Sequence, residues 1–261
     1  MPLLRTEAVV LHVFDYLETS RIVRIATREL GVQSVLARGA RRSRSRYGSA
    51  LDLFASGIAE LSTRPGRDLH TLTSFDVQRA RPGLAEDLGR FTGASALAEL
   101  ALRFSGEDAH PALFETLMSS LDALDSAAPG GTVEVSLGCA WRIVGELGFA
   151  PSLDLCSTCE RAVAPGEIAA FSHRAGGVLC SSCARLEPVH RSLPATARAA
   201  LAAWLAAEEA PALDAGERRA HQRLLREFLR EHFAEGQALR AFDVWENERW
   251  EERSTFVAAP A

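Results

Sequence analysis

The sequence predicts an α+β protein, in which a small N-terminal β-barrel precedes an α-helical domain with an embedded four-cysteine module. Three observations predict this fold class. Short apolar segments with strand-like alternation fill residues 7–77, apolar residues recur at helical spacing from residue 84, and two Cys-x-x-Cys pairs interrupt the helical part.

The N-terminal segment contains five runs that are typical of short strands. Thr27–Gly31 reads as a hairpin connection that ends in glycine, and Arg64–Arg67 as a turn with Pro and Gly. Five short strands in roughly 70 residues suit an OB-fold barrel, although an SH3-like barrel fits the count almost as well. The strands are expected at residues 8–14, 21–26, 33–37, 53–61 and 69–77.

The period of the apolar residues changes to that of a helix after Pro82. Gly130 and Gly131 separate two of the expected helices, and Gly148 occupies a plausible C-cap position. Helices are expected at residues 84–104, 111–124, 133–147, 195–207 and 215–233.

These patterns divide the chain into five segments. The acidic stretch from Trp245 onward, with Trp250, is expected to be a loose tail. The predicted segments are an OB-fold domain at 1–80, a helical domain at 81–152, a four-cysteine module at 153–190, C-terminal helices that pack on the helical domain at 191–244, and the tail at 245–261.

The amino-acid composition permits some classes of protein and excludes others. Hydrophobic residues make up 47% of the 261 residues and charged residues 24%, which permits a normal globular core. The sequence has no apolar run long enough for a membrane span and no signal-peptide pattern at its start, so a cytoplasmic, unprocessed protein is expected. Because there is no lysine, a Walker A phosphate loop and Schiff-base chemistry are excluded.

The net charge of −5 is unevenly distributed. Residues 1–82 contain 13 arginines and 8 acidic residues, whereas the remainder contains 16 arginines and 26 acidic residues. This asymmetry favours contact with nucleic acid through the N-terminal segment, and with protein partners or solvent through the rest.

The two Cys-x-x-Cys pairs carry the most specific chemical signal. Each pair can form a knuckle that directs two thiolates at one point, and two knuckles complete a tetrahedral site. Between them, residues 168–172 and 178–179 can pair as a hairpin that brings the knuckles together. We expect a structural Zn²⁺ site with four ligands, namely Cys156, Cys159, Cys180 and Cys183.

Other interpretations of the cysteines are weaker. Two disulfides are disfavoured in a cytoplasmic chain, and nothing else in the sequence suggests a rubredoxin-like iron site. His173 or His190 could replace one thiolate. Cys139, in a helical stretch, is expected to be a buried small apolar residue.

A dense arginine run lies between the third and fourth expected strands. It contains five arginines within nine residues and no acidic residue, so it repels itself unless an anion is present. Arginine can fork onto phosphate oxygens, and the adjacent tyrosine could stack on an unpaired base. The predicted DNA contacts are Arg38, Arg41, Arg42, Arg44, Arg46 and Tyr47, with a solvated loop as the alternative.

The sequence contains none of the common catalytic motifs, so the protein is not expected to be an enzyme. Two other hypotheses compete with DNA binding. One is a zinc-ribbon protein that binds RNA or acts in transcription, for which the module offers only a modest basic set: Arg161, His173, Arg174 and Arg185. The other is a protein-interaction scaffold that does not bind DNA.

The ordered combination of these features resembles the RecO family of bacterial recombination mediators. The resemblance spans roughly residues 5–243 and lies in the basic segment 37–48, in Pro111–Glu115 and in the junction from Leu147 to Cys159. The stretch from Trp245 has no counterpart in the resemblance, and the lysine-free loop departs from the usual mixture of Lys and Arg.

The resemblance implies a function and a set of partners. RecO proteins bind single- and double-stranded DNA, anneal complementary strands, and act with RecR. Many recognise the acidic C-terminal tail of single-stranded-DNA-binding protein (SSB) and so assist RecA loading on SSB-coated DNA. By this resemblance we expect a DNA repair mediator in the bacterial cytoplasm, associated with the nucleoid, with Zn²⁺ in a structural role.

Overall fold

The computed structural model describes residues 3–48, 50–63, 66, 68–106, 108–187, 190–233 and 238–247. The chain forms two compact units, residues 1–127 and 128–261, which we call the N-terminal and C-terminal units. Their boundary falls inside the segment 81–152 that was expected to be one domain. The first helices after the barrel therefore group with the barrel, and the later ones with the C-terminal end.

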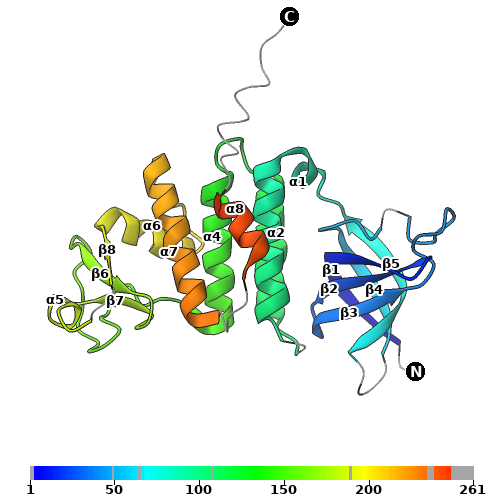
Figure 1. Ribbon diagram of the computed structural model, residues 1–261, viewed down its shortest axis with the longest axis horizontal. Helices are drawn as coiled ribbons and strands as arrows, with labels where there is room; N and C mark the ends of the chain where they lie inside the picture. The colour runs from blue at the N-terminus through cyan, green and yellow to red at the C-terminus, as the bar shows by residue number, and fades with distance from the viewer. Residues whose placement is uncertain are drawn as a thin grey trace, which may run out of the picture. The chain divides into compact units, whose positions relative to one another are not determined.

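Five strands form a closed barrel in the N-terminal unit (Figure 1). The strand order is β1-β2-β3-β5-β4, with one parallel pair between β3 and β5, and the pairing of β4 with β1 closes the barrel. This topology confirms the expected OB-type barrel. The strands are β1 (Leu3–Tyr16), β2 (Ser20–Thr27), β3 (Gly31–Ala37), β4 (Ser56–Ser62) and β5 (Leu69–Arg79).

The barrel interior is filled by alternate residues of the strands, as their pleat requires. Val10, Ile25 and Leu61 are among these core side chains and are almost fully buried. The fourth strand was expected to begin at residue 53 but begins at Ser56, because the backbone of Phe54 is left-handed with φ of 66°. Most of the predicted turn at 64–67 lies outside the described residues.

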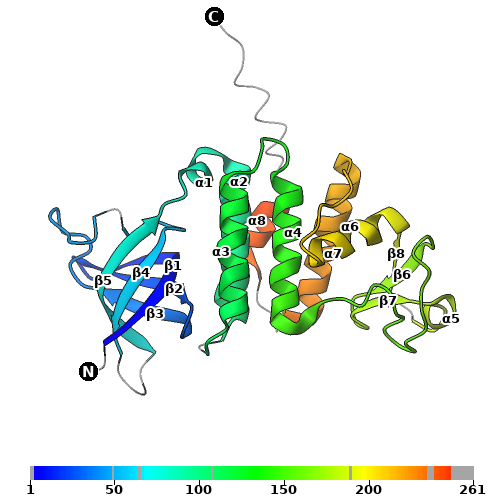
Figure 2. The same ribbon diagram turned by 180° about the vertical axis from the view of Figure 1, so that it is seen from behind.

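The prediction of a single helix over residues 84–104 is wrong. The chain instead forms α1 (Pro82–Glu86) and α2 (Leu88–Phe104), because Asp87 between them is extended and its carboxylate accepts from Arg90 N at 2.9 Å as an N-cap. Next, α3 (Pro111–Asp125) packs beside α2 (Figure 2). A hydrogen bond of 3.3 Å from Arg24 to the Leu102 carbonyl ties α2 to β2.

Helices of the C-terminal unit pack around a buried tryptophan. Trp141 is fully buried on α4, and its ring lies 5.2 Å from that of Phe228 on α7. A Cβ on Gly138 would lie 2.9 Å from the Trp204 ring, so only glycine permits this approach of α6 to α4. The elements are α4 (Thr132–Val144), the π-helical turn η1 (Gly145–Phe149), α6 (Ala195–Leu205), α7 (Ala215–Phe233) and α8 (Arg240–Asn247).

The start of the expected tail needs correction. Trp245 belongs to α8, is 4% exposed, and packs its ring 4.9 Å from that of Phe242. The acidic composition of the segment predicted a loose tail, but the apolar rings of Phe242 and Trp245 are buried, and this burial keeps the segment in α8. Residues 248–261, including Trp250, lie outside the described part of the chain.

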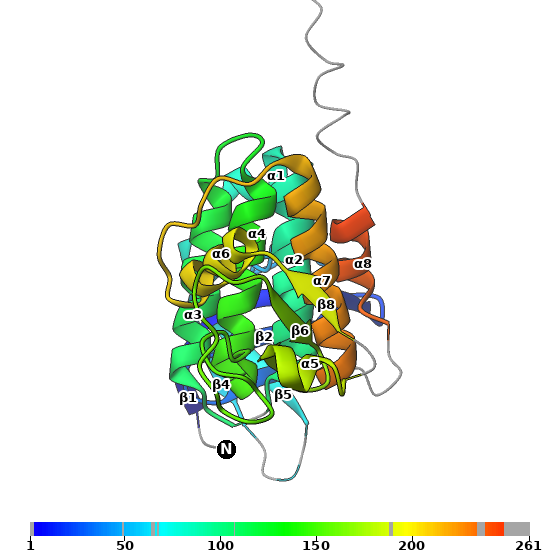
Figure 3. The same cartoon turned by 90° about the vertical axis from the view of Figure 1, so that its left-hand side faces the viewer.

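The four-cysteine module is built on a three-stranded sheet, which faces the viewer in Figure 3. The predicted hairpin is confirmed, because β6 (Ala169–Ser172) and β7 (Gly177–Leu179) pair antiparallel. A third strand, β8 (Arg191–Leu193), was not expected and pairs with the other side of β6. The helix α5 (Ser181–Ala184) follows β7 directly, so the sheet holds the second cysteine knuckle in place.

Candidate nucleic-acid interface and metal centre

The basic loop that joins β3 to β4 is a compact series of turns. Arg42 N donates to Gly39 O at 3.1 Å, and Ser45 N donates to Arg42 O at 2.9 Å. Gly39 has a φ of 71°, a conformation that glycine adopts without strain. Arg41 N donates to Thr19 O at 3.0 Å, which fixes the start of the loop against the β1–β2 turn. The arginines are thus presented on an ordered backbone.

Tyr47 does not have the predicted role. Its side chain belongs to the barrel core, is 3% exposed, and donates its hydroxyl to Leu72 O at 2.7 Å. Burial is the main cause that raises the pKa of this hydroxyl. Arg46 covers the buried ring, with its guanidinium carbon 5.0 Å from the ring centroid. Tyr47 therefore anchors the loop in the barrel and is not free to stack on a base.

The five loop arginines fall into two groups. Arg41 shares the carboxylate of Asp15, at 3.5 Å, with Arg21, and Arg46 donates to the Tyr47 hydroxyl at 3.0 Å. The other three are exposed and, within the described residues, have no carboxylate at ion-pair distance: Arg38, Arg42 and Arg44. These three guanidiniums are available to an external anion such as phosphate.

The four predicted metal ligands lie together. Their sulfur atoms are all within 4.8 Å of one another, and the Sγ atoms of Cys159 and Cys180 are 3.7 Å apart. A tetrahedral Zn²⁺ site with bonds of about 2.3 Å places its sulfurs about 3.8 Å apart, whereas a disulfide bond is about 2.05 Å long. All four cysteines are free thiols, so the arrangement fits a metal and not the disulfide alternative.

Backbone groups prepare the cluster for a cation. Burial alone would raise the pKa of the Cys156 thiol, but N–H groups of Cys180, Thr158 and Cys159 outweigh it and bring the pKa to about 6. Hydrogen bonds with Cys159 and then Cys180 raise the pKa of Cys183 to about 12. Four sulfurs this close cannot all ionise without a cation to balance them, which is the electrostatic situation of a four-thiolate metal site.

Neither histidine considered as a substitute ligand joins the cluster. His173 places its Nε2 atom 3.0 Å from Glu227 on α7, and the same carboxylate forms a bidentate pair with Arg191 of β8. His190 Nδ1 is instead 3.0 Å from the Glu187 carbonyl. The contacts of Glu227 thus attach the four-cysteine module to α7, so the module and this helix are mechanically coupled.

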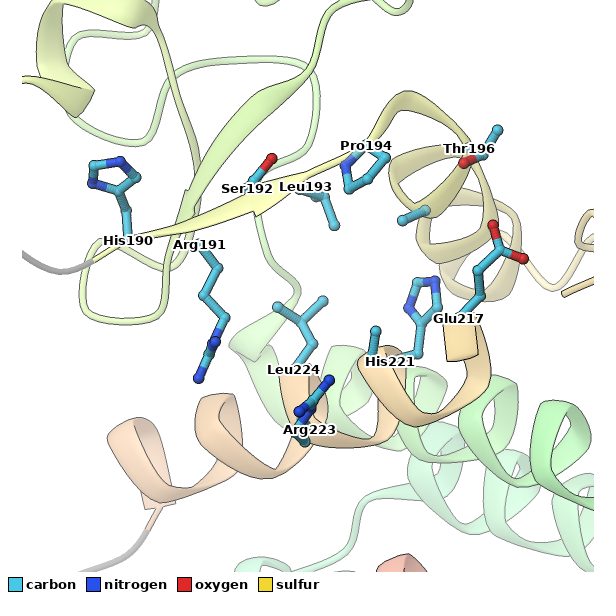
Figure 4. Close-up of a pocket in the computed structure, with 12 residues that line it drawn as sticks. His190, Arg191, Ser192, Leu193, Pro194, Thr196, Glu217, His221, Arg223 and Leu224 are labelled. Carbon is cyan, nitrogen blue, oxygen red and sulfur yellow. The ribbon is translucent and has the colours of Figure 1, made fainter. Parts of the chain in front are cut away.

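A pocket of about 480 Å³ opens between β8, α6 and α7 (Figure 4). Leu193 from β8 and Leu224 from α7 point toward it, and the exposed Arg223 lies at its edge. His221 is 2% exposed and neither ring nitrogen has a hydrogen-bond partner within the described residues; burial lowers its pKa to about 4. The pocket therefore offers apolar side chains, a neutral imidazole, the Glu217 carboxylate and Arg223, which has no ion-pair partner within the described residues.

Sequence reasoning did not identify this pocket, because its lining residues come from segments separated in the chain and lie among ordinary helical patterns. The exposed aromatic residues of β1, His12, Phe14 and Tyr16, were also missed. A signal for them was present, since they alternate along the strand with Val13 and Asp15. In the described part of the chain, no helix has the length and apolar character needed to cross a membrane.

Comparison with known proteins agrees with this architecture. The family model Recombination protein O N terminal matches residues 1–81, and Recombination protein O C terminal matches residues 85–240. A DNA repair protein RecO of Anaeromyxobacter sp. (strain K) is 39% identical over 254 residues, which cover 93% of this chain and 96% of the relative.

Two further relatives carry the same name. The DNA repair protein RecO of Anaeromyxobacter dehalogenans (strain 2CP-1) is 39% identical over 246 residues, 90% of this chain and 93% of the relative. The DNA repair protein RecO of Rubrobacter xylanophilus is 37% identical over 184 residues, which cover 70% of this chain and 72% of the relative. With the barrel, the helices and the cysteine cluster in the expected order, the chain belongs to the RecO family of DNA repair proteins.

Proposed function

We propose that the protein is a recombination mediator that binds single- and double-stranded DNA through the basic loop of its barrel. The observation that carries the proposal is the set of three exposed arginines, Arg38, Arg42 and Arg44, which have no carboxylate partner within the described residues. Arginine forks bind phosphate oxygens in any sequence, and the loop backbone is already ordered.

The proposed activity requires no catalytic residue. A basic surface lowers the repulsion between two phosphate backbones, and base pairing supplies the free energy for annealing complementary strands. The protein would therefore act as an annealing and loading factor, and not as an enzyme. In keeping with its family, we propose that it works with RecR and assists RecA loading on SSB-coated DNA in the bacterial cytoplasm, at the nucleoid.

The four-cysteine cluster is proposed to hold one structural Zn²⁺. Four protein thiolates leave no coordination position for substrate, so the ion would stabilise the module without taking part in a reaction. Cys156, Cys159, Cys180 and Cys183 would bind it, and the N–H groups that lower the pKa of Cys156 would stabilise the thiolate form. The contacts of Glu227 would transmit this stabilisation to α7.

The pocket beside Arg223 is proposed as the site for the acidic C-terminal tail of SSB. Its apolar residues, such as Leu193 and Leu224, suit an apolar side chain of a peptide, and Arg223 suits a carboxylate. The imidazole of His221, kept neutral by burial, supplies one donor and one acceptor to a bound backbone. The C-terminal unit would then contact the protein partner while the barrel contacts DNA.

Salt-dependent binding of a labelled single-stranded oligonucleotide tests the DNA proposal. Changing Arg38, Arg42 and Arg44 together to Ala should weaken binding and reduce the slope of log affinity against log salt by about 2, at roughly 0.7 per phosphate contact. The matched control changes Arg161, Arg174 and Arg185 of the four-cysteine module to Ala, since these are also exposed and the charge lost is equal.

Each outcome decides between hypotheses. If only the loop variant has a reduced slope of log affinity against log salt, the result supports the proposal. Loss in the module variant alone would favour the zinc-ribbon hypothesis, and a wild type that does not bind would favour a protein-interaction scaffold. Folding of each variant is checked by circular dichroism before binding is measured.

A further inference from the structure

The outer face of β1 carries a row of exposed aromatic side chains. Phe14 is 46% exposed and Tyr16 is 39% exposed, and the ring of His12 lies 4.1 Å from that of Phe14 at an angle of 31°. Large aromatic side chains are normally buried, so a contiguous exposed row indicates a surface that binds something. We call His12, Phe14 and Tyr16 the aromatic row.

The row continues across neighbouring strands. Phe14 pairs with Ile22 on β2, and Ile22 pairs with Leu36 on β3. Residues directly opposite each other in antiparallel strands point to the same face, so these three side chains form one surface three strands wide. Ile22 and Leu36 are partly exposed, which widens the apolar platform on which the aromatic rings lie.

The side chains of His12, Phe14 and Tyr16 are exposed at this end of the face. A register shift in the pairing of β1 with β2 falls between Val10 and His12, and from there the aromatic residues take the outward positions while Val13 packs toward the barrel core. Helix α2 reaches the same sheet at Arg24, whose guanidinium donates to the Leu102 carbonyl. Arg24 pairs with His12, so the row begins next to this contact with α2.

The basic loop starts at the far end of the row. β3 ends at Ala37, and the exposed Arg38 is the first residue after it, two positions beyond Leu36. Arg41 donates to the carbonyl of Leu17, the residue after Tyr16, at 3.2 Å. The nearby carboxylate of Asp15 lies 3.4 Å from Arg21 and 3.5 Å from Arg41, so its charge is balanced.

Aromatic rings beside arginines have the chemistry that recognises unpaired bases. Bases in a duplex are stacked on both faces, whereas bases of a single strand offer a free face to an aromatic side chain, and the backbone that links them carries phosphates for the arginines. A protein partner would not need the phosphate-binding groups at the end of the row. We propose that the aromatic row stacks on bases of single-stranded DNA and gives the barrel a preference for single strands over duplex.

This inference rests on the proposed DNA binding, and its test separates the two. Affinity is measured for a single-stranded oligonucleotide, for the same strand with abasic sites throughout, and for a duplex. Changing Phe14 and Tyr16 to Leu keeps the apolar bulk but removes the rings. We expect roughly five-fold or greater weakening per ring for the normal strand, and less than about two-fold change for the abasic strand and the duplex.

Control variants keep the result interpretable. Tyr16→Phe retains the ring and should bind like the wild type, and Leu3→Ala removes an exposed apolar side chain, 61% exposed, from the other end of β1. The salt slope should not change in any of these variants, because no phosphate contact is lost.

Three results would overturn the inference while leaving DNA binding intact: equal affinity of the wild type for normal and abasic strands, normal single-strand binding by the Leu variant, or equal weakening for strand and duplex. Failure of the wild type to bind any DNA would remove the proposed function itself. If the Leu variant does not fold, Tyr16→Leu alone and the abasic comparison with wild type still decide the question.

Discussion

Arg81 and Asp122 join the end of the barrel to α3 through a hydrogen-bonded ion pair, with 2.7 Å between the arginine Nε and the carboxylate Oδ1. Arg81 is 6% exposed, and one of its terminal nitrogens also donates to the Phe54 carbonyl at 2.7 Å. Burial lowers the pKa of Arg81, an effect that the Asp122 carboxylate opposes. The N-terminal unit therefore depends on this carboxylate to balance a buried guanidinium.

Asp122→Asn should destabilise the N-terminal unit by about 2 kcal/mol, because it leaves a buried charge without its partner. The cost is smaller than for a fully buried ion pair, since the Asp122 side chain is 34% exposed. Urea unfolding followed by circular dichroism measures the change. Glu115→Gln on the same helix is the control; its ion pair with Arg28 lies at the surface, so its loss should destabilise the unit less than the loss of Asp122 does. Equal effects of the two variants would contradict the argument.

Removal of the proposed Zn²⁺ should selectively destabilise the C-terminal unit. Purified wild type is expected to contain one Zn²⁺ per chain by elemental analysis, and Cys156→Ser should lose it, because three thiolates and a hydroxyl form a weaker site. Cys139→Ala is the matched control, since Cys139 is buried on α4, outside the cluster. Chelation should lower the thermal stability of the four-cysteine module while salt-dependent binding to the barrel is retained. Full metal content in Cys156→Ser would rule out this ligand set.

His221 should make the stability of the protein depend on pH. Burial lowers its pKa from 6.5 to about 4, so the unfolded chain binds a proton more tightly than the folded one. The free energy of unfolding therefore keeps its full value above pH 6.5 and decreases as the pH falls toward 4, by about 3 kcal/mol at most. His221→Phe keeps a ring against Trp204 and should lose this dependence. Parallel stability curves of wild type and variant between pH 4 and 7 would refute the prediction.

Arg223 should determine the affinity of the pocket for acidic peptides. A fluorescent peptide with the sequence of an SSB C-terminal tail should bind the wild type, and Arg223→Ala should weaken it roughly tenfold through loss of a charged hydrogen bond. Arg219→Ala is the control, because Arg219 is exposed about one turn away on α7 but does not line the pocket. Equal weakening by both variants would indicate a general charge effect and argue against the pocket as the site.

The sequence alone determined the features that depend on local spacing. Alternation of apolar residues predicted the barrel strands because successive side chains of a strand face opposite sides. Each Cys-x-x-Cys pair predicted a knuckle because two thiols three residues apart can meet at one point, and the pairs Cys156–Cys159 and Cys180–Cys183 do lie together. The arginine run predicted an exposed basic loop because like charges cannot be buried together.

Only the tertiary structure decided the features that depend on which side chains meet across the fold. Tyr47 is next to Arg46 in the chain, but its ring enters the barrel core and its hydroxyl bonds Leu72, so its direction was set by packing that no local pattern records. His221 and Leu193 face one pocket only because α7 packs beside β8. The type of a residue and its neighbours in sequence indicate which interactions its side chain can form. Burial and long-range contacts determine which of these interactions it forms in the folded protein.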